Sequence, residues 1–244
     1  MRQKLNWSAQ LLVVLLCALV LKHHYSVATP DQLRWILAPT AFLVELSSGT
    51  SFTFESYAGY MSSDHTFLIA ASCAGVNFLI TAFLMLTLGK LWKERQSTIS
   101  WRFIPIAGVV AYVTTIVANT VRIYVALHLR RAEFTSVDPN QLHLYEGIVV
   151  YFAFLLMLFM LTEQVSVEKE GSLIQRVAFP LLVYYAIAIG VPLLNGGYKR
   201  GLEFWQHSLF VLVIPLVPLM VLIGLRSLSA PLFLQPSQRQ RRRM

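Results

Sequence analysis

The sequence predicts an all-α polytopic membrane protein with six or seven transmembrane helices. Of its 244 residues, 56% are hydrophobic and only 13% are charged, and the mean hydropathy is +0.60. Several apolar segments reach the roughly 20 residues that a helix needs to cross a hydrocarbon core about 30 Å thick. A soluble domain of this length has no interior large enough for so much apolar surface.

Apolar segments recur along the whole chain. In order they cover residues 5–21, 33–47, 67–89, 103–126, 143–161, 177–194 and 204–225. The first has no small-residue cleavage site around Lys22, so we interpret it as a retained anchor and not as a signal peptide. The second is short and contains Pro39 and Glu45; it is either a short span or a half-inserted helix, which decides between six and seven crossings.

Residues 50–66 differ from their neighbours. Aromatic residues alternate there with Ser, Thr and Glu on both sides of Ala58-Gly59, and the segment contains no Lys or Arg. A period of two around a small-residue turn is typical of a β-hairpin. We therefore expect a short interfacial hairpin just before the helix that carries Cys73.

The distribution of Lys and Arg predicts the topology. If the spans alternate, thirteen of these residues share one side and six share the side of Cys73, with one arginine inside a span. In the seven-span arrangement Lys22 and Arg34 belong to the larger group and Arg2 and Lys4 to the smaller; six spans with an internal N-terminus fit equally well. Because basic residues favour the cytoplasm, Cys73 faces outward in both arrangements.

Composition also argues against several functions. The net charge of +8 comes from residues between spans and at the C-terminus, which set topology and can contact anionic lipid, so we do not expect nucleic-acid binding. Two cysteines are too few for a disulfide framework. The chain contains no phosphate-binding loop, nucleophile elbow or zinc signature, and we expect neither a cofactor nor a metal.

Polar residues form stripes on the apolar spans. Cys73, Asn77 and Thr81 have a spacing of four residues, which predicts one helix face. The following span carries a second stripe, formed by Thr115, Asn119 and Arg122. Polar stripes of this kind point into a helix bundle, where other helices supply hydrogen-bond partners. Alternation of the spans brings Cys73, Arg122 and His143 to one membrane face.

These residue types suit nucleophilic catalysis. A cysteine reacts as the thiolate, which a nearby cation, an imidazolium or a helix N-terminus favours. His143 is the candidate proton acceptor and donor. Arg122 is permanently charged and suits stabilisation of a thiolate or an oxyanion, and Asn119 is placed to orient it. Glu146 either orients His143 or is an ordinary acidic residue in a first helical turn.

Each residue also has an ordinary interpretation when it is taken alone. Cys73 can be a packing residue, Arg122 can extend to the interface, and His143 can be an interfacial residue at a helix start. The alternative functions are a transporter or channel with Arg122 as a substrate-binding charge, and an assembly factor without chemistry. The combination of Cys73, Arg122 and His143 on one membrane face favours catalysis over these alternatives.

The motifs resemble those of the exosortase/archaeosortase family of membrane cysteine transpeptidases, most closely the exosortase K type. Ser72-Cys73-Ala74-Gly75 is similar to the nucleophile motif of that family, Asn119 to Arg122 to its N-x-x-R motif, and His143 to Gly147 to its H-x-x-x-G motif. The order and approximate spacing agree, and so does the expected hairpin. Ala74 departs from the pattern, in which serine is commoner.

The resemblance implies a single integral-membrane domain over residues 1–244, with a catalytic core at about 33–161 and a basic cytoplasmic tail at 227–244. It implies Cys73 as nucleophile, Arg122 as stabiliser and His143 as acid/base, with Asn119, Asn77 and Glu146 in support. The substrates would be exported proteins that end in a recognition motif, a transmembrane helix and a basic tail. The enzyme would lie in the bacterial inner membrane with its active site at the periplasmic face.

Overall fold

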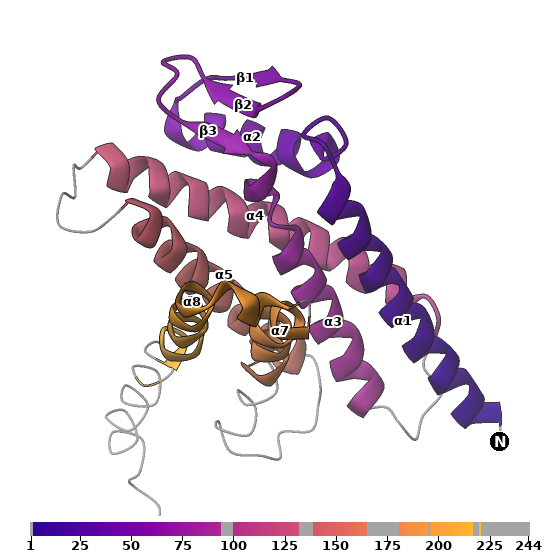
Figure 1. Ribbon diagram of the computed structural model, residues 1–244. Coiled ribbons are helices and arrows are strands. Elements are labelled where there is room, and N and C mark those ends of the chain that lie inside the picture. The colour runs from indigo at the N-terminus through magenta and orange to yellow at the C-terminus, as the bar shows by residue number, and fades with distance from the viewer. Residues whose placement is uncertain are drawn as a thin grey trace, which may run out of the picture.

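The computed structural model describes residues 2–93, 100–131, 139–164, 181–194, 196–216 and 220. Most of these residues are helical, as the sequence predicts, and a small three-stranded sheet lies at one end (Figure 1). The helices are α1 (Arg2–Val27), α2 (Arg34–Ser48), α3 (Val76–Lys93), α4 (Phe103–Arg131), α5 (Pro139–Gln164), α7 (Val191–Leu194) and α8 (Leu202–Val213). The strands are β1 (Phe52–Glu55), β2 (Gly59–Ser62) and β3 (Leu68–Ala70). Short helical turns are η1 (Ala71–Ala74), η2 (Ala186–Gly190) and η3 (Gly197–Arg200).

Four helices in the described part of the chain are long and apolar enough to cross a membrane. They contain residues Asn6–Val27, Ala71–Trp92, Phe103–Leu129 and Tyr145–Thr162. The predicted segment 33–47 becomes α2, which has 15 residues and falls short of a full crossing. The predicted segments 177–194 and 204–225 lie only partly within the described residues, and their described helices are shorter than α2. The predicted tail at 227–244 lies outside the described residues.

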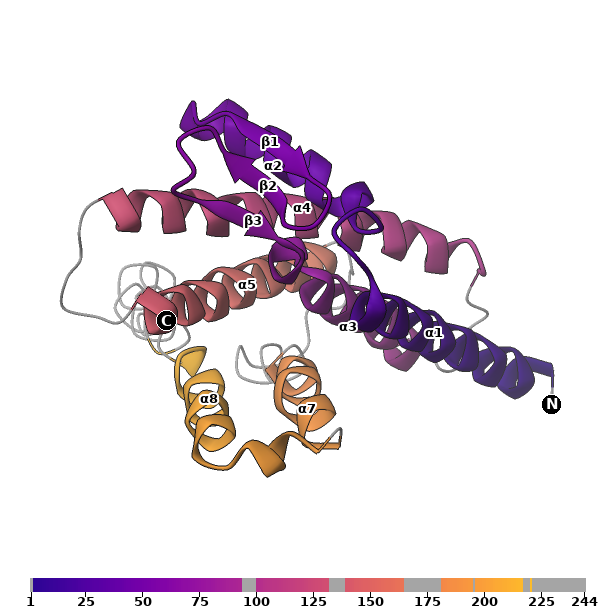
Figure 2. The ribbon, with the colours of Figure 1, turned by 45° about the horizontal axis from the view of Figure 1, so that its top comes forward.

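Helices α1 and α3 run antiparallel, side by side (Figure 2). Near the start of α1, Trp7 Nε1 donates to the Leu91 carbonyl at 3.0 Å; near its end, Lys22 Nζ donates to Asn77 Oδ1 at 2.8 Å. The chain therefore leaves α1 and enters α3 at the same end of the bundle. Lys22 lies at the Cys73 end, which contradicts the seven-span expectation that placed it at the opposite one.

The predicted hairpin is confirmed, and it is larger than expected. Strands β1 and β2 pair antiparallel from Phe52 with Ser62 to Glu55 with Gly59. Strand β3 then pairs with β2, so residues that the sequence pattern assigned to the beginning of a helix form a third strand. Gly59 has a φ of +123°, and a Cβ there would lie 2.3 Å from the Ile69 carbonyl oxygen, so the close approach of β3 requires glycine at this position.

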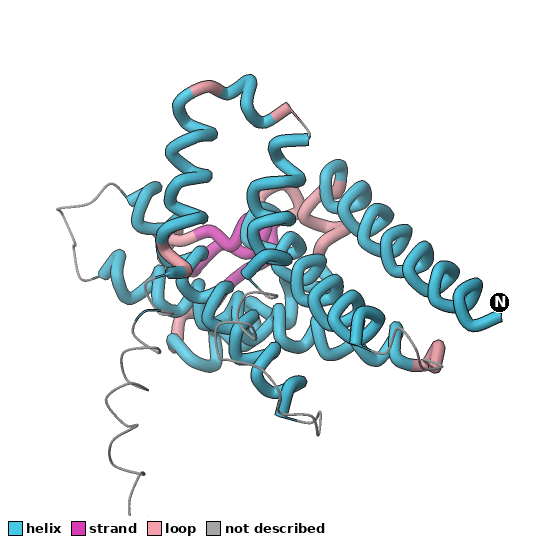
Figure 3. Tube along the Cα trace, turned by 90° about the horizontal axis from the view of Figure 1, so that it is seen from below, coloured by secondary structure: helices cyan, strands magenta, loops and turns pink. Residues whose placement is uncertain are grey.

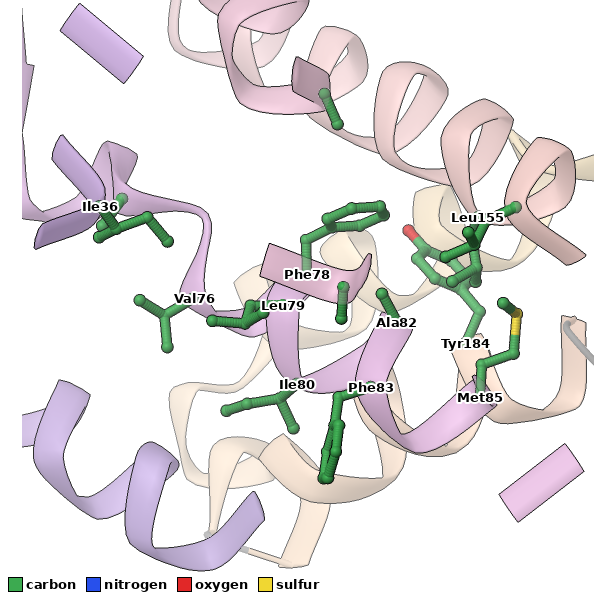
Figure 4. Close-up of a cluster of buried hydrophobic side chains, with 14 of the residues drawn as sticks. Ile36, Val76, Phe78, Leu79, Ile80, Ala82, Phe83, Met85, Leu155 and Tyr184 are labelled. Atoms are coloured by element: carbon green, nitrogen blue, oxygen red, sulfur yellow. The ribbon is translucent and has the colours of Figure 1, made fainter. Parts of the chain in front are cut away.

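Helix α3 is the centre of the bundle. In the most apolar 18-residue stretch of the span Ala71–Trp92, 72% of the residues are buried, against 17% in that of the span in α1. Its apolar side chains pack against α5 and against the segment that carries Tyr184 (Figure 4). In a view from below, the described chain is almost entirely helical, and the strands lie together in one small region (Figure 3). This packing fixes the turn that precedes α3, where Cys73 lies.

Candidate active site

Cys73 lies in a turn at the start of the membrane-length segment Ala71–Trp92 and not in its α-helix, α3. It belongs to η1, a single 3₁₀ turn, and Gly75 with a φ of +70° separates that turn from α3, which begins at Val76. The thiol residue is buried, with 8% of its surface exposed. The expected helix over 67–89 is therefore wrong for its first nine residues, because β3 pairs with β2 and the left-handed glycine breaks the helix.

This break also separates Cys73 from the predicted stripe. Asn77 is exposed and accepts the hydrogen bond from Lys22, whereas Thr81 is buried and donates its hydroxyl to the Asn77 carbonyl at 2.8 Å. The expectation that Cys73, Asn77 and Thr81 share an inward face is wrong. The break at Gly75 takes Cys73 out of the helical spacing, which holds only within a continuous α-helix. Asn77 is one turn from Thr81 in α3, but it lies at the exposed start of that helix. Asn77 connects α3 to α1 and does not contribute to the buried cluster.

The stripe on α4 has the predicted orientation. Thr115, Asn119 and Arg122 are all buried. The Asn119 side chain is fully enclosed; its Nδ2 donates to the Cys73 carbonyl oxygen, and its Oδ1 accepts a hydrogen bond from Tyr151 Oη at 2.9 Å. Asn119 thus joins the turn that carries Cys73 to α4 and α5.

Arg122 points into the protein and does not extend to the interface. Only 8% of its surface is exposed, and the guanidinium carbon lies 5.3 Å from the centre of the Tyr151 ring. Gly147 of α5 lies beside it, since a Cβ at this position would be in ordinary van der Waals contact with Arg122, 3.7 Å from Cδ. Glu146 is also buried and interacts electrostatically with Arg122.

The guanidinium of Arg122 retains unused hydrogen-bonding capacity. Its Nε and Nη2 atoms are buried and have no hydrogen-bond partner among the described residues. Leaving a buried donor unpaired costs free energy, more so when the group is charged. These two donors are therefore available for a carbonyl, an oxyanion or a carboxylate of a ligand beside Cys73.

His143 is a residue of α5, but its side chain lies outside the described part of the structure. It precedes Gly147 by four residues, so the two positions share one face of the helix. Gly147 lies beside Arg122, so the backbone of His143 is one turn from Arg122 toward the helix N-terminus.

Two tyrosines belong to the cluster although the sequence analysis did not select them. The hydroxyls of Tyr25 and Tyr151 each interact electrostatically with both Cys73 and Arg122. Tyr151 follows Gly147 by four residues and could have been found by extending the predicted α5 face. Tyr25 could not, because no pattern in α1 indicates that its end packs against a turn about 50 residues later in the chain.

The described site combines a thiol, a guanidinium with free donors, a carboxamide and two phenol hydroxyls. Among the described residues no group of three or more His, Cys, Asp or Glu side chains has the arrangement of a metal site. Comparison of the chain with protein-family models, curated proteins and solved structures finds no match. The inference of function therefore depends on the residues and on their geometry.

Proposed function

We propose that this protein is a membrane cysteine peptidase or transpeptidase that cleaves a C-terminal sorting signal through an acyl-thioester on Cys73. One observation carries the proposal: a buried cysteine and a buried arginine belong to one cluster, although they come from different segments, and the described residues leave two donors of the arginine unpaired. A buried cation with unpaired donors is costly, and such residues in membrane helices mark functional sites.

The proposed reaction uses the groups of the cluster together with His143, whose role is the one expected from the sequence. The Cys73 Sγ attacks the scissile carbonyl carbon, its proton passes to His143, and a C–S bond forms. Arg122 Nε and Nη2 donate to the resulting oxyanion. When the C–N bond breaks, His143 returns the proton to the leaving amine. Water or an acceptor amine then attacks the thioester, and the sulfur leaves and regains a proton.

The proposed location is the bacterial inner membrane, crossed several times, with the site at the periplasmic face. The antiparallel arrangement of α1 and α3 supports the six-span topology. In that topology Arg2 and Lys4 replace Lys22 and Arg34 in the cytoplasmic group, so the ratio of basic residues stays at thirteen to six. The positive-inside rule then favours an external Cys73.

The proposed substrates are exported proteins with a recognition motif, one transmembrane helix and a basic tail at the C-terminus. The lipid bilayer would be the second partner, because such a helix reaches the site laterally. The reaction as derived uses only side chains of this chain and no cofactor. The test is capture of the thioester: purified protein is incubated with membrane extract of the source organism and examined by intact mass spectrometry.

Cys17 supplies a matched control, since it is the only other cysteine and lies exposed on α1. We expect a hydroxylamine-sensitive adduct on the wild type and on Cys17→Ala, and none on Cys73→Ala. The adduct should form more slowly on Arg122→Ala and His143→Ala. Absence of any adduct, together with normal cellular behaviour of Cys73→Ala, would refute the proposal and favour a transporter in which Arg122 binds an anion.

A further inference from the structure

A chain of two hydrogen bonds leads from α5 to the backbone of the candidate nucleophile. Tyr151 Oη donates to Asn119 Oδ1 at 2.9 Å, and Asn119 Nδ2 donates to the carbonyl oxygen of Cys73. Asn119 is fully buried, so water does not compete for either bond. The position of Cys73 relative to α4 thus depends on Tyr151, a residue that has no part in the proposed reaction.

The Tyr151 hydroxyl completes the hydrogen bonding of the Asn119 amide in the orientation that binds Cys73. The Cys73 carbonyl accepts only, so it requires the NH₂ end of the carboxamide. The Tyr151 hydroxyl donates to the oxygen end. Without the hydroxyl, the buried Asn119 Oδ1 loses this donor, and the Asn119 side chain is held less firmly against the Cys73 turn.

The ring of Tyr151 also contacts Arg122, the second residue of the candidate site whose position it affects. It stacks on Phe78 of α3, with ring centres 4.9 Å apart and planes inclined by 17°. The Arg122 guanidinium carbon lies 5.3 Å from the centre of the same ring. One side chain therefore contacts the helix after Cys73, orients the residue that holds Cys73, and lies against Arg122.

We propose that Tyr151 is a positioning residue, which holds Cys73 and Arg122 in their relative arrangement through Asn119. The chemical role deepens the proposed peptidase function and depends on it, but the geometric role can be measured without a substrate. Loss of the hydroxyl should uncouple the Cys73 turn from Arg122, while the ring continues to fill its place between Phe78 and the guanidinium.

The experiment measures the electrostatic influence of Arg122 on the thiol. In a Cys17→Ala background Cys73 is the only cysteine. The protein in a zwitterionic detergent reacts with an anionic reagent, 2-sulfonatoethyl methanethiosulfonate, or with a cationic one, 2-(trimethylammonium)ethyl methanethiosulfonate. The ratio of the two rates cancels general accessibility and reports the local charge. Arg122→Gln calibrates the ratio in the absence of the guanidinium.

We expect the anionic-to-cationic ratio to fall toward the Arg122→Gln value in Tyr151→Phe, because loss of one hydrogen bond weakens the hold of Asn119 on the Cys73 turn. Asn119→Ala should show a similar fall. If Tyr151 acts through Asn119, the double variant falls no further than Asn119→Ala, since residues in one network are not additive. A fall in the double variant equal to the product of the two single effects would refute this mechanism.

Tyr185→Phe is the matched control, because Tyr185 Oη also donates to a backbone carbonyl, that of Leu212, at 2.7 Å. Tyr185→Phe should lower the midpoint of thermal unfolding about as much as Tyr151→Phe does, and it should keep the wild-type ratio of the two reaction rates. An unchanged ratio in Tyr151→Phe, with a clear fall in Asn119→Ala, would overturn the proposal. A changed ratio combined with no thioester on the wild type would support the positioning role and reject only the peptidase function.

Discussion

The two ends of the helix bundle use polar side chains differently. At the end where α1 begins, Trp7 and Trp101 donate to the Leu91 carbonyl and to Asn6 at 3.0 and 2.9 Å, and Lys90 lies 5.0 Å from the centre of the Phe103 ring. In these contacts the indole N–H groups of Trp7 and Trp101 both have a hydrogen-bond acceptor at the edge of the bundle. The other end contains a cluster of buried polar residues around Cys73, in which two donors of Arg122 have no partner among the described residues.

This difference distinguishes contacts that stabilise the fold from the groups that we propose bind a ligand. Interfacial tryptophans fix the register of helices and satisfy their own donors in doing so. A buried guanidinium with unused donors does not stabilise the fold in this way, because its desolvation is incompletely compensated. We therefore expect variants at the Trp7 end to affect stability and variants at the Cys73 end to affect chemistry.

The largest expected effect is that of Arg122→Lys. Lysine keeps a charge opposite Glu146 but lacks the planar set of donors that a developing oxyanion needs. The rate of thioester formation should fall by about 10²–10³-fold, while the midpoint of thermal unfolding changes little. Trp7→Phe is the control from the other end: it should lower the midpoint and leave the rate unchanged. Equal losses of stability in both variants would contradict the comparison.

A smaller effect is expected from a pair of glycines with the same backbone conformation. Gly75 and Gly49 have φ values of +70° and +68°, so alanine introduces a cost of about 1–2 kcal/mol at both. A Cβ at Gly49 meets nothing within 4 Å, whereas one at Gly75 lies 3.2 Å from Tyr151 Oη. Gly75→Ala should therefore lower the free energy of unfolding more than Gly49→Ala and also slow thioester formation; denaturant titration and mass spectrometry measure the two effects.

The smallest expected effect concerns the turn between β2 and β3, which lies at the Cys73 end but outside the cluster. Hydrogen bonds from the Ser62 hydroxyl, at 2.6 Å, and from the Thr66 N–H, at 3.1 Å, lower the pKa of the exposed Asp64 from 3.8 to about 2. Its contribution to stability is present above about pH 4 and lost as the pH falls toward 2.

Thermal unfolding of the wild type and of Asp64→Asn at a series of pH values tests this expectation. The difference between them should be constant at neutral pH and disappear near pH 2, while the reactivity of Cys73 stays the same in both at neutral pH. A loss of Cys73 reactivity in Asp64→Asn would show that the sheet takes part in forming the site, which the comparison of the two ends does not predict.

Much of this arrangement follows from the sequence alone. Apolar length predicts the long helices, and alternation with a small-residue turn predicts the β1–β2 hairpin, because both depend on local patterns. Within the continuous helix α4, the spacing of Thr115, Asn119 and Arg122 predicts their burial on one face.

Tertiary structure decided the rest. The pairing of β3 with β2 and the left-handed Gly75 took Cys73 out of the helix and turned Asn77 toward Lys22, and neither effect is visible in a hydrophobic pattern. The contacts of Cys73 with Asn119, and of Tyr151 with Arg122, join residues far apart in the chain. Local propensity carries no information about such contacts, since they arise only when the helices pack and their buried polar groups must find one another.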